Sequence, residues 1–243
     1  MDNWELLLKK AEEYGIILTD KQLGQFKDYW EFLNEYNQHT NLVSNSTQDV
    51  VVAKHFIDSL AIGLIKDNIG WNEPKTLIDI GIGGGFPGVP IIIANPEWKL
   101  CAVDSVCKKT KFIELLAEKL GIQDRIEVIN GRAEELARQE DKREKFDLAV
   151  ARAVSHLSVL SEYCLPFLKK NGYFVAYKAK DVDTEINQSK KALNILGGEI
   201  TNVTSYDSPD KEDVERNMIL VKKLKPTPPA YPRKAGTPKK NPL

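Results

Sequence analysis

The chain has 243 residues, of which 42% are hydrophobic, and its 34 lysines and arginines against 35 aspartates and glutamates give a formal net charge of −1. This length is able to bury a sizeable core, and the charge excludes a globally basic nucleic-acid binder, so a polyanion would have to meet a local basic patch. The three cysteines show neither metal-ligand spacing nor an even disulfide count, no apolar run approaches about 18 residues, and no export signal is visible, so we expect a soluble chain in a reducing cytoplasm.

Three helices are expected before the first strand. They cover residues 2–14, residues 20–36 after a cap at Thr19 or Asp20, and residues 49–66 after a polar turn. The second helix carries aromatic and aliphatic residues at three- and four-residue steps, which is typical of a helix packed on a core. We therefore expect residues 1–70 to form a helical extension that packs on the domain after it.

The third of these helices places His55, Asp58 and Ser59 three or four residues apart, so their side chains share one face. A histidine beside an acid on a helix is more often a surface pair than a functional group. The same face is also able to border a pocket, and both interpretations stay open.

The stretch over residues 76–88 reads T-L-I-D-I-G-I-G-G-G-F-P-G, which predicts a strand, a glycine turn and the start of a helix. Apolar residues on both sides of Asp79 indicate a buried parallel strand with an acid near its end. Gly81, Gly83 and Gly85 then allow the backbone to turn sharply and to approach a ligand that a Cβ atom would hold away. A plain tight turn would use the same residues, so the loop alone is a weak signal.

The spacing of the glycines bears on the kind of cofactor. The dinucleotide fingerprint G-x-G-x-x-G requires a third glycine where this chain has Phe86, which argues against a nicotinamide-dependent oxidoreductase. The observed pattern D-x-G-x-G-x-G resembles motif I of the class I S-adenosylmethionine-dependent methyltransferases. Their cofactor carries an amino-acid tail, a sulfonium and an adenosine but no pyrophosphate, and a short turn beside a carboxylate suits it.

A second strand, over residues 99–104, ends in Asp104, which lies about 20 residues past the glycines. A carboxylate at this place is able to accept hydrogen bonds from both ribose hydroxyls. The alternative is a helix cap, a role that Ser105 would serve as well.

Strands and helices alternate through the rest of the chain. Strands are expected near residues 76–81, 99–104, 125–130, 146–152, 172–179, 200–206 and 217–224, and helices near 87–94, 108–120, 133–140, 155–168 and 182–196. This order predicts an α/β fold, with a Rossmann-like and mainly parallel sheet over residues 71–224 and helices on both faces. Ligands of such sheets bind at the carboxyl ends of the strands.

Two further strand ends carry candidate residues. After the third strand, Ala133 and Glu134 are placed to read adenine through a backbone amide and a carboxylate, although acids also favour a helix N-terminus without any ligand. After the fourth strand stands Arg152, where methyltransferases of exocyclic amines carry an Asn- or Asp-Pro-Pro-aromatic run. An arginine that emerges from a buried strand requires an anionic or π-stacked partner, either cofactor or nucleic acid.

Basic residues gather at the start of the helix after the second strand. Lys108, Lys109 and Lys111 stand in its first turns, where cations oppose the helix dipole. A solvated face and a phosphate contact both account for them.

The C-terminal segment is also basic. Residues 222–243 hold seven lysines and arginines, no acids and half of the prolines of the chain. We expect residues 225–243 to form a basic, proline-rich tail that follows an extended path or is disordered. Its Tyr231, Arg233 and Lys234 suit stacking on bases and contact with phosphates.

Nearly the whole chain resembles the RsmG family, also called glucose-inhibited division protein B. The motifs that carry the resemblance are H-F-I-D-S-L, D-I-G-I-G-G-G-F-P-G-V-P, V-D-S-V-C-K-K, G-R-A-E, A-R-A-V and the terminal Y-P-R-K-A-G-T-P-K-K-N-P-L. One departure is Gly84, where many members carry alanine, and it changes no polar group.

The resemblance implies a class I fold and a cytoplasmic enzyme. Such an enzyme uses S-adenosyl-L-methionine to methylate N7 of a guanine in small-subunit (16S) ribosomal RNA, as free RNA or in an assembling small subunit, without a metal or a membrane. The cofactor contacts of the family fall on Gly81, Phe86, Ala133, Glu134 and Arg152, and the ribose interpretation adds Asp104.

Guanine N7 keeps a lone pair outside the aromatic system, so it is able to attack a sulfonium methyl without losing a proton. No residue is therefore singled out as catalytic, and we expect catalysis to consist largely of positioning. Because the product base is cationic, Asp58 or another nearby carboxylate is a candidate for stabilising the developing charge. Two alternatives stay open: a non-catalytic RNA-binding module on a methyltransferase scaffold, and a methyltransferase of another substrate.

Overall fold

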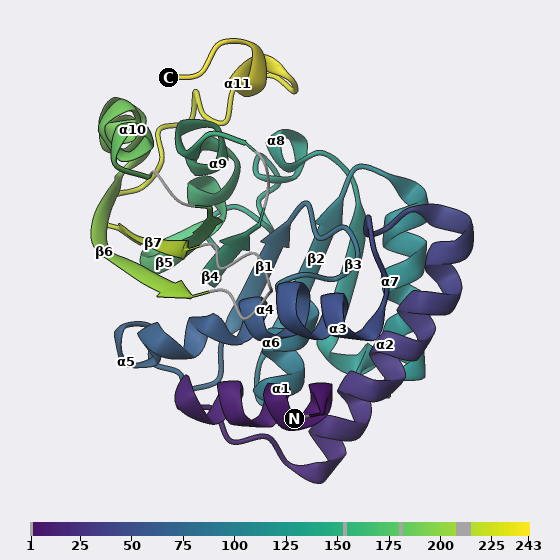
Figure 1. The fold of residues 1–243 in the computed structure, drawn as a ribbon. Coiled ribbons are helices and arrows are strands. Elements are labelled where there is room, and N and C mark those ends of the chain that lie inside the picture. The colour runs from purple at the N-terminus through teal and green to yellow at the C-terminus, as the bar shows by residue number, and fades with distance from the viewer. Residues whose placement is uncertain (1, 153–154, 180–181, 208–214) are drawn as a thin grey trace.

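The computed structural model describes residues 2–152, 155–179, 182–207 and 215–243. Seven strands form one sheet in the order β3-β2-β1-β4-β5-β7-β6, in which β7 runs antiparallel to both of its neighbours (Figure 1). The strands are β1 Thr76–Ile80, β2 Lys99–Asp104, β3 Ile126–Asn130, β4 Phe146–Ala151, β5 Leu168–Lys178, β6 Gly198–Asp207 and β7 Glu215–Lys223. The predicted α/β fold with a mainly parallel sheet is confirmed, although β5 begins before the expected residue 172.

Helices connect the strands and cover both faces of the sheet (Figure 1). From β1 onward they are α6 Gly88–Ala94, α7 Cys107–Lys119, α8 Ala133–Leu136, α9 Leu157–Cys164, α10 Val182–Leu196 and α11 Thr237–Lys240, with 3-10 turns η3 Gln123–Arg125 and η4 Leu165–Phe167. The expected helix over residues 155–168 therefore ends early, because η4 leads directly into β5.

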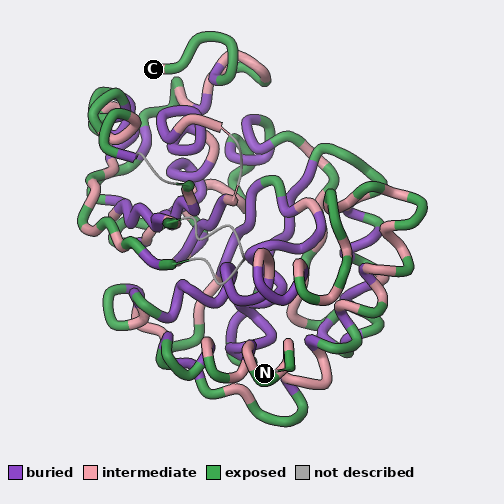
Figure 2. The backbone as a smooth tube through the Cα atoms, viewed as in Figure 1, coloured by how far each residue is buried: buried purple, intermediate pink, exposed green. Residues whose placement is uncertain are grey.

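Alternate residues of each strand point to opposite faces of the sheet, which divides the core into two clusters. Leu77 of β1 and Leu100 of β2 pack in the cluster that holds α1, α2, α6 and α7, whereas Ile78 and Cys101 pack in the cluster that holds α8, α9 and α10. Figure 2 shows the central strands buried along their length, with exposed backbone on the outer helices and loops. Burial on both faces is typical of parallel strands in an α/β sheet.

The segment before β1 is not the single α-helix that the sequence predicts over residues 49–66. The structure forms a run of short pieces, α3 Gln48–Val50, the π-helical segment η1 Val51–Ile57, α4 Asp58–Leu60, the 3-10 segment η2 Ala61–Ile65 and α5 Lys66–Ile69. A Cβ atom at Gly63 would lie 2.4 Å from the carbonyl oxygen of Tyr14, so this run packs against the chain that follows α1 so closely that no side chain fits at residue 63. π-Helical segments often occur at functional sites, and η1 contains His55.

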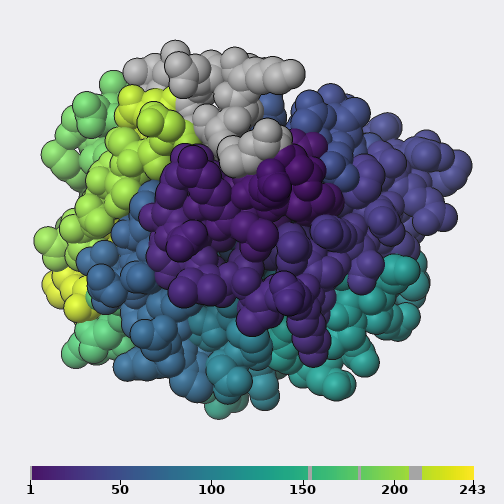
Figure 3. Space-filling view, turned by 60° about the horizontal axis from the view of Figure 1, so that its bottom comes forward, coloured from purple at the N-terminus to yellow at the C-terminus, as the bar shows by residue number. Residues whose placement is uncertain are grey.

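Two helices, α1 Asn3–Glu13 and α2 Asp20–Thr40, cover this run. Trp4 of α1 packs edge-on against Trp30 of α2, with ring centroids 6.3 Å apart. Tyr14, just after α1, packs edge-on against Tyr206 of β6 at 6.5 Å. In Figure 3, α1 lies across the molecular surface between α2 and the strands β6 and β7. The N-terminal helices therefore share one core with the sheet.

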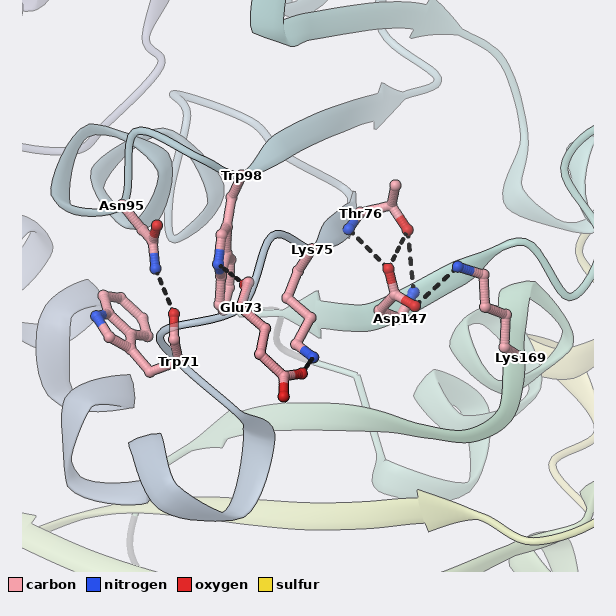
Figure 4. Close-up of polar contacts among 8 residues, drawn as sticks. All are labelled: Trp71, Glu73, Lys75, Thr76, Asn95, Trp98, Asp147 and Lys169. Carbon is pink, nitrogen blue, oxygen red and sulfur yellow. Dashed lines mark hydrogen bonds and ion pairs between the residues drawn. The ribbon is translucent and has the colours of Figure 1, made fainter.

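Polar contacts join the amino-terminal ends of the central strands (Figure 4). Oδ2 of Asp147 accepts hydrogen bonds from Thr76 N at 2.9 Å and from Thr76 Oγ1 at 2.7 Å, and its Oδ1 accepts one from Lys169 Nζ at 2.8 Å. The indole of Trp98 donates to the carbonyl oxygen of Glu73 at 2.9 Å. These contacts fix the segment before β1 at the amino-terminal ends of the strands. The candidate residues lie at the opposite, carboxyl ends.

The C-terminal segment, residues 225–243, lies against α8 and α9 (Figure 1). Tyr231 and Leu243 pack on the core cluster of that face. Arg143 donates to the carbonyl oxygen of Thr227 at 2.7 Å and to that of Tyr231 at 2.9 Å. Of the two expected states of the tail, disorder is therefore wrong, because side chains of the main body bind its backbone.

Candidate functional site

The glycine loop joins β1 to α6, and its three alternating glycines all have positive φ. The angles are +80° at Gly81, +57° at Gly83 and +101° at Gly85. A Cβ atom at Gly85 would lie 2.1 Å from the hydroxyl oxygen of Tyr29, so no side chain fits there. A Cβ atom at Gly81 would meet no atom of the described chain within 4 Å. The loop is therefore tightly packed at Gly85 and open in front of Gly81, where a ligand is able to approach the backbone.

Asp79 lies beneath this loop and is fully buried. Its Oδ2 accepts a hydrogen bond from Gly88 N at 2.8 Å, whereas its Oδ1 has no partner among the described residues. Burial raises the pKa of Asp79 to about 7, and the hydrogen bond from Gly88 opposes this rise. Asp79 thus joins β1 to the first turn of α6 rather than facing a ligand.

A pocket opens at the carboxyl ends of β1, β2 and β3, and we call it the glycine-loop pocket. Its lining residues are Ile80, Gly81, Val103, Asp104, Ser105, Gly131, Arg132, Ala133, Glu134, Ser155, Leu160 and Tyr163. Four of the six residues predicted to bind a cofactor meet here, namely Gly81, Asp104, Ala133 and Glu134. The strand ends converge in this way because β1, β2 and β3 are parallel neighbours.

Asp104 is almost fully buried at the end of β2. Its Oδ2 accepts a hydrogen bond from Gly83 N at 3.1 Å and lies 3.6 Å from Lys109 Nζ, and its Oδ1 accepts one from Val106 N at 2.9 Å. A carboxylate oxygen accepts more than one hydrogen bond, so both oxygens keep capacity for a pair of adjacent hydroxyls. The backbone contacts hold the carboxylate in place between the glycine loop and the start of α7.

Glu134 is the acid of the pocket that lies on α8, and it is 4% exposed. Its Oε1 accepts a hydrogen bond at 2.8 Å from the backbone N–H of Gly236, which belongs to the C-terminal segment. Sequence reasoning missed this contact, since the two residues are about a hundred positions apart. A usable signal was the run A-G-T-P, which places a glycine before a helix-starting proline and so marks an ordered turn.

Phe86 does not line the glycine-loop pocket. Its ring lies between those of Tyr29, at 5.3 Å and 8° between planes, and His55, at 4.7 Å and 18°. The guanidinium carbon of Arg152 lies 5.1 Å from the centre of the same ring. Phe86 and Arg152, the other two predicted residues, are thus neighbours of each other in a stacked cluster beside the glycine loop.

Arg152 is held by groups from the π-helical segment and from α4. Its Nη1 donates to Asp58 Oδ2 at 2.9 Å and to the carbonyl oxygen of Lys54 at 3.2 Å, and its Nη2 contacts His55 Nδ1 at 2.9 Å. The hydroxyl of Tyr206 donates to Asp58 Oδ1 at 2.7 Å. Both oxygens of Asp58 are therefore engaged, and Asp58 holds Arg152 in place. Its role in stabilising charge on a substrate stays a prediction.

His55 is neutral in this cluster. Burial, followed by the charge of Arg152, lowers the pKa of His55 to about 3. A neutral imidazole is able to accept the hydrogen bond from Arg152 at Nδ1, which a protonated ring is not. Of the two interpretations left open for this helix face, the structure agrees with the one that borders a pocket, because His55 and Asp58 both contact Arg152 and line the pocket described next. Ser59 is fully buried, and its hydroxyl donates to the carbonyl oxygen of His55 at 2.6 Å.

A second and larger pocket, of about 690 Å³, opens next to this cluster, and we call it the Arg152 pocket. Its lining residues are Lys54, His55, Asp58, Arg152, Ser155, His156, Tyr177, Lys178, Ala179, Glu185, Tyr206 and Arg216. Ser155 lines both pockets, so the two adjoin at this residue. The volume lies in the range of small-molecule sites. Part of the A-R-A-V motif, residues 153–154, falls outside the described residues.

The lysines at the start of α7 have partners within the chain. Lys108 Nζ donates to the carbonyl oxygen of Thr40 at 3.0 Å, Lys109 lies near Asp104, and Lys111 Nζ donates to Glu114 at 3.0 Å. The contacts of Lys108 and Lys111 are exposed, and such contacts are weak and give way to a phosphate at small cost. Both expectations for these lysines, a solvated face and a phosphate contact, are compatible with this arrangement.

Comparison with known proteins finds one matching family model and several relatives that align with this chain over nearly its full length. The family model described as rRNA small subunit methyltransferase G (GidB) matches residues 22–217. The ribosomal RNA small subunit methyltransferase G of Acetivibrio thermocellus is 45% identical over 249 residues, with 100% of both chains covered. The proteins of the same name from Lactobacillus acidophilus and Bacillus subtilis are each 43% identical over 241 residues and cover 99% of both chains.

Solved structures with a similar fold are much less similar in sequence. An O-methyltransferase from Bacillus cereus in complex with SAH has a TM-score of 0.56 at 14% identity and covers 80% of this chain and 90% of its own. Cofactor-bound Rv0187 has a TM-score of 0.54 at 14% identity, with 83% and 91% covered. Within the described ranges no helix is long and apolar enough to cross a membrane, and no group of three histidine, cysteine or acidic side chains is placed to hold a metal.

Proposed function

The chain belongs to the ribosomal RNA small subunit methyltransferase G family, and on this premise we propose that it transfers the methyl group of S-adenosylmethionine to N7 of a guanine in 16S ribosomal RNA. The observation that carries the proposal is the identity of 43 to 45% to proteins of that name, which extends over 99 to 100% of both chains. The finer points, the nitrogen atom and the base, come from the family resemblance and are open to test.

The residues of the glycine-loop pocket fit S-adenosylmethionine. The open space in front of Gly81 admits a ligand against the backbone, and the carboxylate of Asp104 is fixed with capacity for two hydroxyls, as a ribose requires. Ala133 and Glu134 stand at the start of α8, just after β3, where a backbone amide and a carboxylate would hold the adenine. The cofactor itself supplies an electrophilic methyl group on a sulfonium.

We assign the target guanine to the Arg152 pocket. This pocket adjoins the glycine-loop pocket at Ser155 and has room for a nucleotide base. Guanine N7 presents a lone pair and carries no proton, so the reaction needs alignment of nitrogen, methyl and sulfur rather than a general base. Positioning of this kind is worth up to roughly 7–11 kcal/mol of a reaction barrier.

Arg152 lines the Arg152 pocket, and Phe86 would support its guanidinium from the glycine loop. The guanidinium is fixed at two nitrogens, by Asp58 and His55, and lies over the ring of Phe86. A planar cation held in this way suits stacking or hydrogen bonding to a planar base or to the carboxylate of the cofactor. The fixed geometry, rather than proton transfer, would be its contribution.

The RNA would bind across the edge of the sheet that carries both pockets. Three exposed lysines of the C-terminal segment, Lys234, Lys239 and Lys240, are called the tail lysines below. They stand on the same segment as Gly236, which contacts Glu134 in the glycine-loop pocket. These cations, with Lys108 and Lys111 of α7, would neutralise phosphates around the target, as free RNA or as part of an assembling small subunit.

We also keep two proposals that rest on the sequence. One is the division into a helical extension over residues 1–70, a methyltransferase domain over residues 71–224 and a basic tail over residues 225–243. The other is a cytoplasmic location, where ribosomal RNA is modified. The C-terminal segment is joined to the domain by side-chain contacts, so it would act as part of the domain rather than as a separate arm.

The test is a transfer assay with methyl-labelled S-adenosylmethionine and the purified chain. Small-subunit RNA and assembling small subunits are offered in parallel, with large-subunit RNA as the control. We expect label in the small-subunit RNA at a nucleotide that aniline cleaves after reduction, because this treatment detects N7-methylguanine. Label at a nucleotide that resists the treatment would overturn the N7 assignment. No label in any RNA, with the cofactor bound, would favour the non-catalytic RNA-binding alternative.

A further inference from the structure

The C-terminal segment is attached to α9 by a buried ion pair. Glu162 is fully buried, and it accepts hydrogen bonds from Arg233 at the backbone nitrogen, at 2.7 Å, and at Nη2, at 2.6 Å. Nε of Arg233 bridges both carboxylate oxygens at 3.0 and 3.2 Å. Arg233, which the sequence marked for phosphate contact, is thus used inside the protein. Breaking such a pair leaves an uncompensated buried charge, so the attachment is strong.

Two arginines that follow α8 hold the chain before this ion pair. Arg138 donates through Nη2 to the carbonyl oxygen of Pro232 at 2.5 Å. Arg143 binds the carbonyl oxygens of Thr227 and Tyr231. Because these hydrogen bonds hold the backbone at several points before Arg233, the residues just after Arg233 have a fixed position relative to α8.

Gly236 is the residue that this arrangement brings to the glycine-loop pocket. Its φ is +82°, and a Cβ atom at this position would meet no described atom within 4 Å, so glycine is favoured by the backbone angle and not by space. Its N–H donates to Glu134 Oε1 at 2.8 Å. A hydrogen bond to one oxygen of a nearly buried carboxylate sets the direction of the other oxygen.

We propose that the segment from Arg233 to Gly236 is a positioning element of the cofactor site, which orients the Glu134 carboxylate toward the adenine. This proposal rests on the cofactor assignment above, in which Glu134 holds S-adenosylmethionine. Coupling between two sites is reciprocal, so a bound cofactor also stabilises the docked segment. The tail lysines stand on the same segment, and cofactor binding therefore fixes the phosphate contacts that they offer.

The main test is a double-mutant cycle on cofactor affinity. The four proteins are the wild-type chain, the chain truncated after Ala235, the Glu134→Ala variant and the variant with both changes. Truncation after Ala235 replaces the Gly236 N–H by a terminal carboxylate but leaves Arg233 and its ion pair in place. The affinity for S-adenosylhomocysteine is measured by calorimetry, and thermal unfolding verifies that each protein is folded.

We expect truncation to weaken the wild-type affinity by about tenfold, as the loss of a hydrogen bond to a charged group would. In the Glu134→Ala background the same truncation is expected to change nothing, because the group it acts through is absent. No loss in the wild-type background, or an equal loss in both backgrounds, would overturn the proposal. The chain truncated after Gly236 is the control, since it loses the same residues after Gly236 and also ends in a carboxylate but keeps the Gly236 N–H, and its affinity should be unchanged.

If a variant binds too weakly for calorimetry, amide hydrogen exchange on the full-length chain tests the same coupling between Gly236 and the cofactor site. The Gly236 N–H should exchange more slowly when S-adenosylhomocysteine is added, and faster in the Glu134→Ala variant. An exchange rate that responds to neither change would overturn the proposal. Neither measurement uses RNA, so a failure of RNA methylation and a failure of this inference are distinguishable.

Discussion

Replacing Asp58 tests whether the stacked cluster depends on one buried carboxylate. Asp58 is 3% exposed and engages Arg152 through Oδ2 and Tyr206 through Oδ1. Loss of one partner of a buried ion pair costs about 3–5 kcal/mol. The Arg152 side chain is 19% exposed and keeps its contacts to Lys54 and His55, so we place Asp58→Ala at the lower end, about 3 kcal/mol.

The assay is urea unfolding, read as the change in the free energy of unfolding, together with methyl transfer to the RNA substrate. Asp58→Asn keeps polar atoms for both partners and should cost less than Asp58→Ala. Asp67→Ala, which removes an exposed acid of α5, is the matched control and should stay within about 0.5 kcal/mol of the wild type. Methyl transfer should fall in Asp58→Ala because the guanidinium is no longer fixed over Phe86.

The double variant of Asp58 and Arg152 tests whether the Asp58 carboxylate stabilises the protein by compensating the charge of the Arg152 guanidinium. If the carboxylate acts by compensating the guanidinium, removing both should cost clearly less stability than the sum of the two single changes. Strictly additive losses, or an Asp58→Ala protein as stable as the Asp67→Ala control, would refute the argument from the ion pair.

Three further outcomes follow from the site. Because burial raises the pKa of Asp79 to about 7, the folded protein binds the Asp79 proton more tightly than the unfolded protein does. The free energy of unfolding of the wild type should therefore fall, relative to that of Asp79→Asn, as the pH rises from about 4 to 7. Equal pH profiles of the two proteins in urea unfolding would contradict this prediction. Gly85→Ala should destabilise the protein by more than about 2 kcal/mol in thermal unfolding, because its Cβ would lie 2.1 Å from the Tyr29 hydroxyl, whereas Gly121→Ala, which has positive φ but no described atom within 4 Å, should cost about 1 kcal/mol. Changing all three tail lysines to glutamine should weaken RNA binding and reduce the slope of log affinity against log salt by about 2, with cofactor affinity unchanged; an unchanged slope would remove these lysines from the RNA contact.

The parts of the fold that follow from local pattern could be predicted from the sequence. The strand over residues 76–80 has apolar residues on both faces, and its glycines mark the turn at its end, so β1 and the loop were expected. The alternation of elements then gives a parallel sheet, and parallel strands bring their carboxyl ends to one edge. The sequence therefore predicts that Gly81, Asp104 and Ala133 lie at a common site.

The contacts between distant segments could not be predicted in this way. Phe86 stands in the glycine loop, yet its ring packs between Tyr29 of α2 and His55 of the π-helical segment, and no periodicity indicates such a stack. The composition of the C-terminal segment predicts an extended or disordered tail, because it has cations and prolines but few apolar residues. Composition does not show that Glu162, an acid on α9, is buried and requires Arg233 as its partner.

The guanidinium beside Phe86 is paired with a carboxylate of the protein, and this bears on the proposed chemistry. Methylation at N7 places a positive charge on a base that had none, so an uncompensated cation next to the base would raise the barrier. Arg152 is paired with Asp58, and His55, with a pKa of about 3, adds no charge near neutral pH. The same ion pair that fixes the guanidinium thus also limits its repulsion of the product, which explains why a site built on an arginine is compatible with a cationic product.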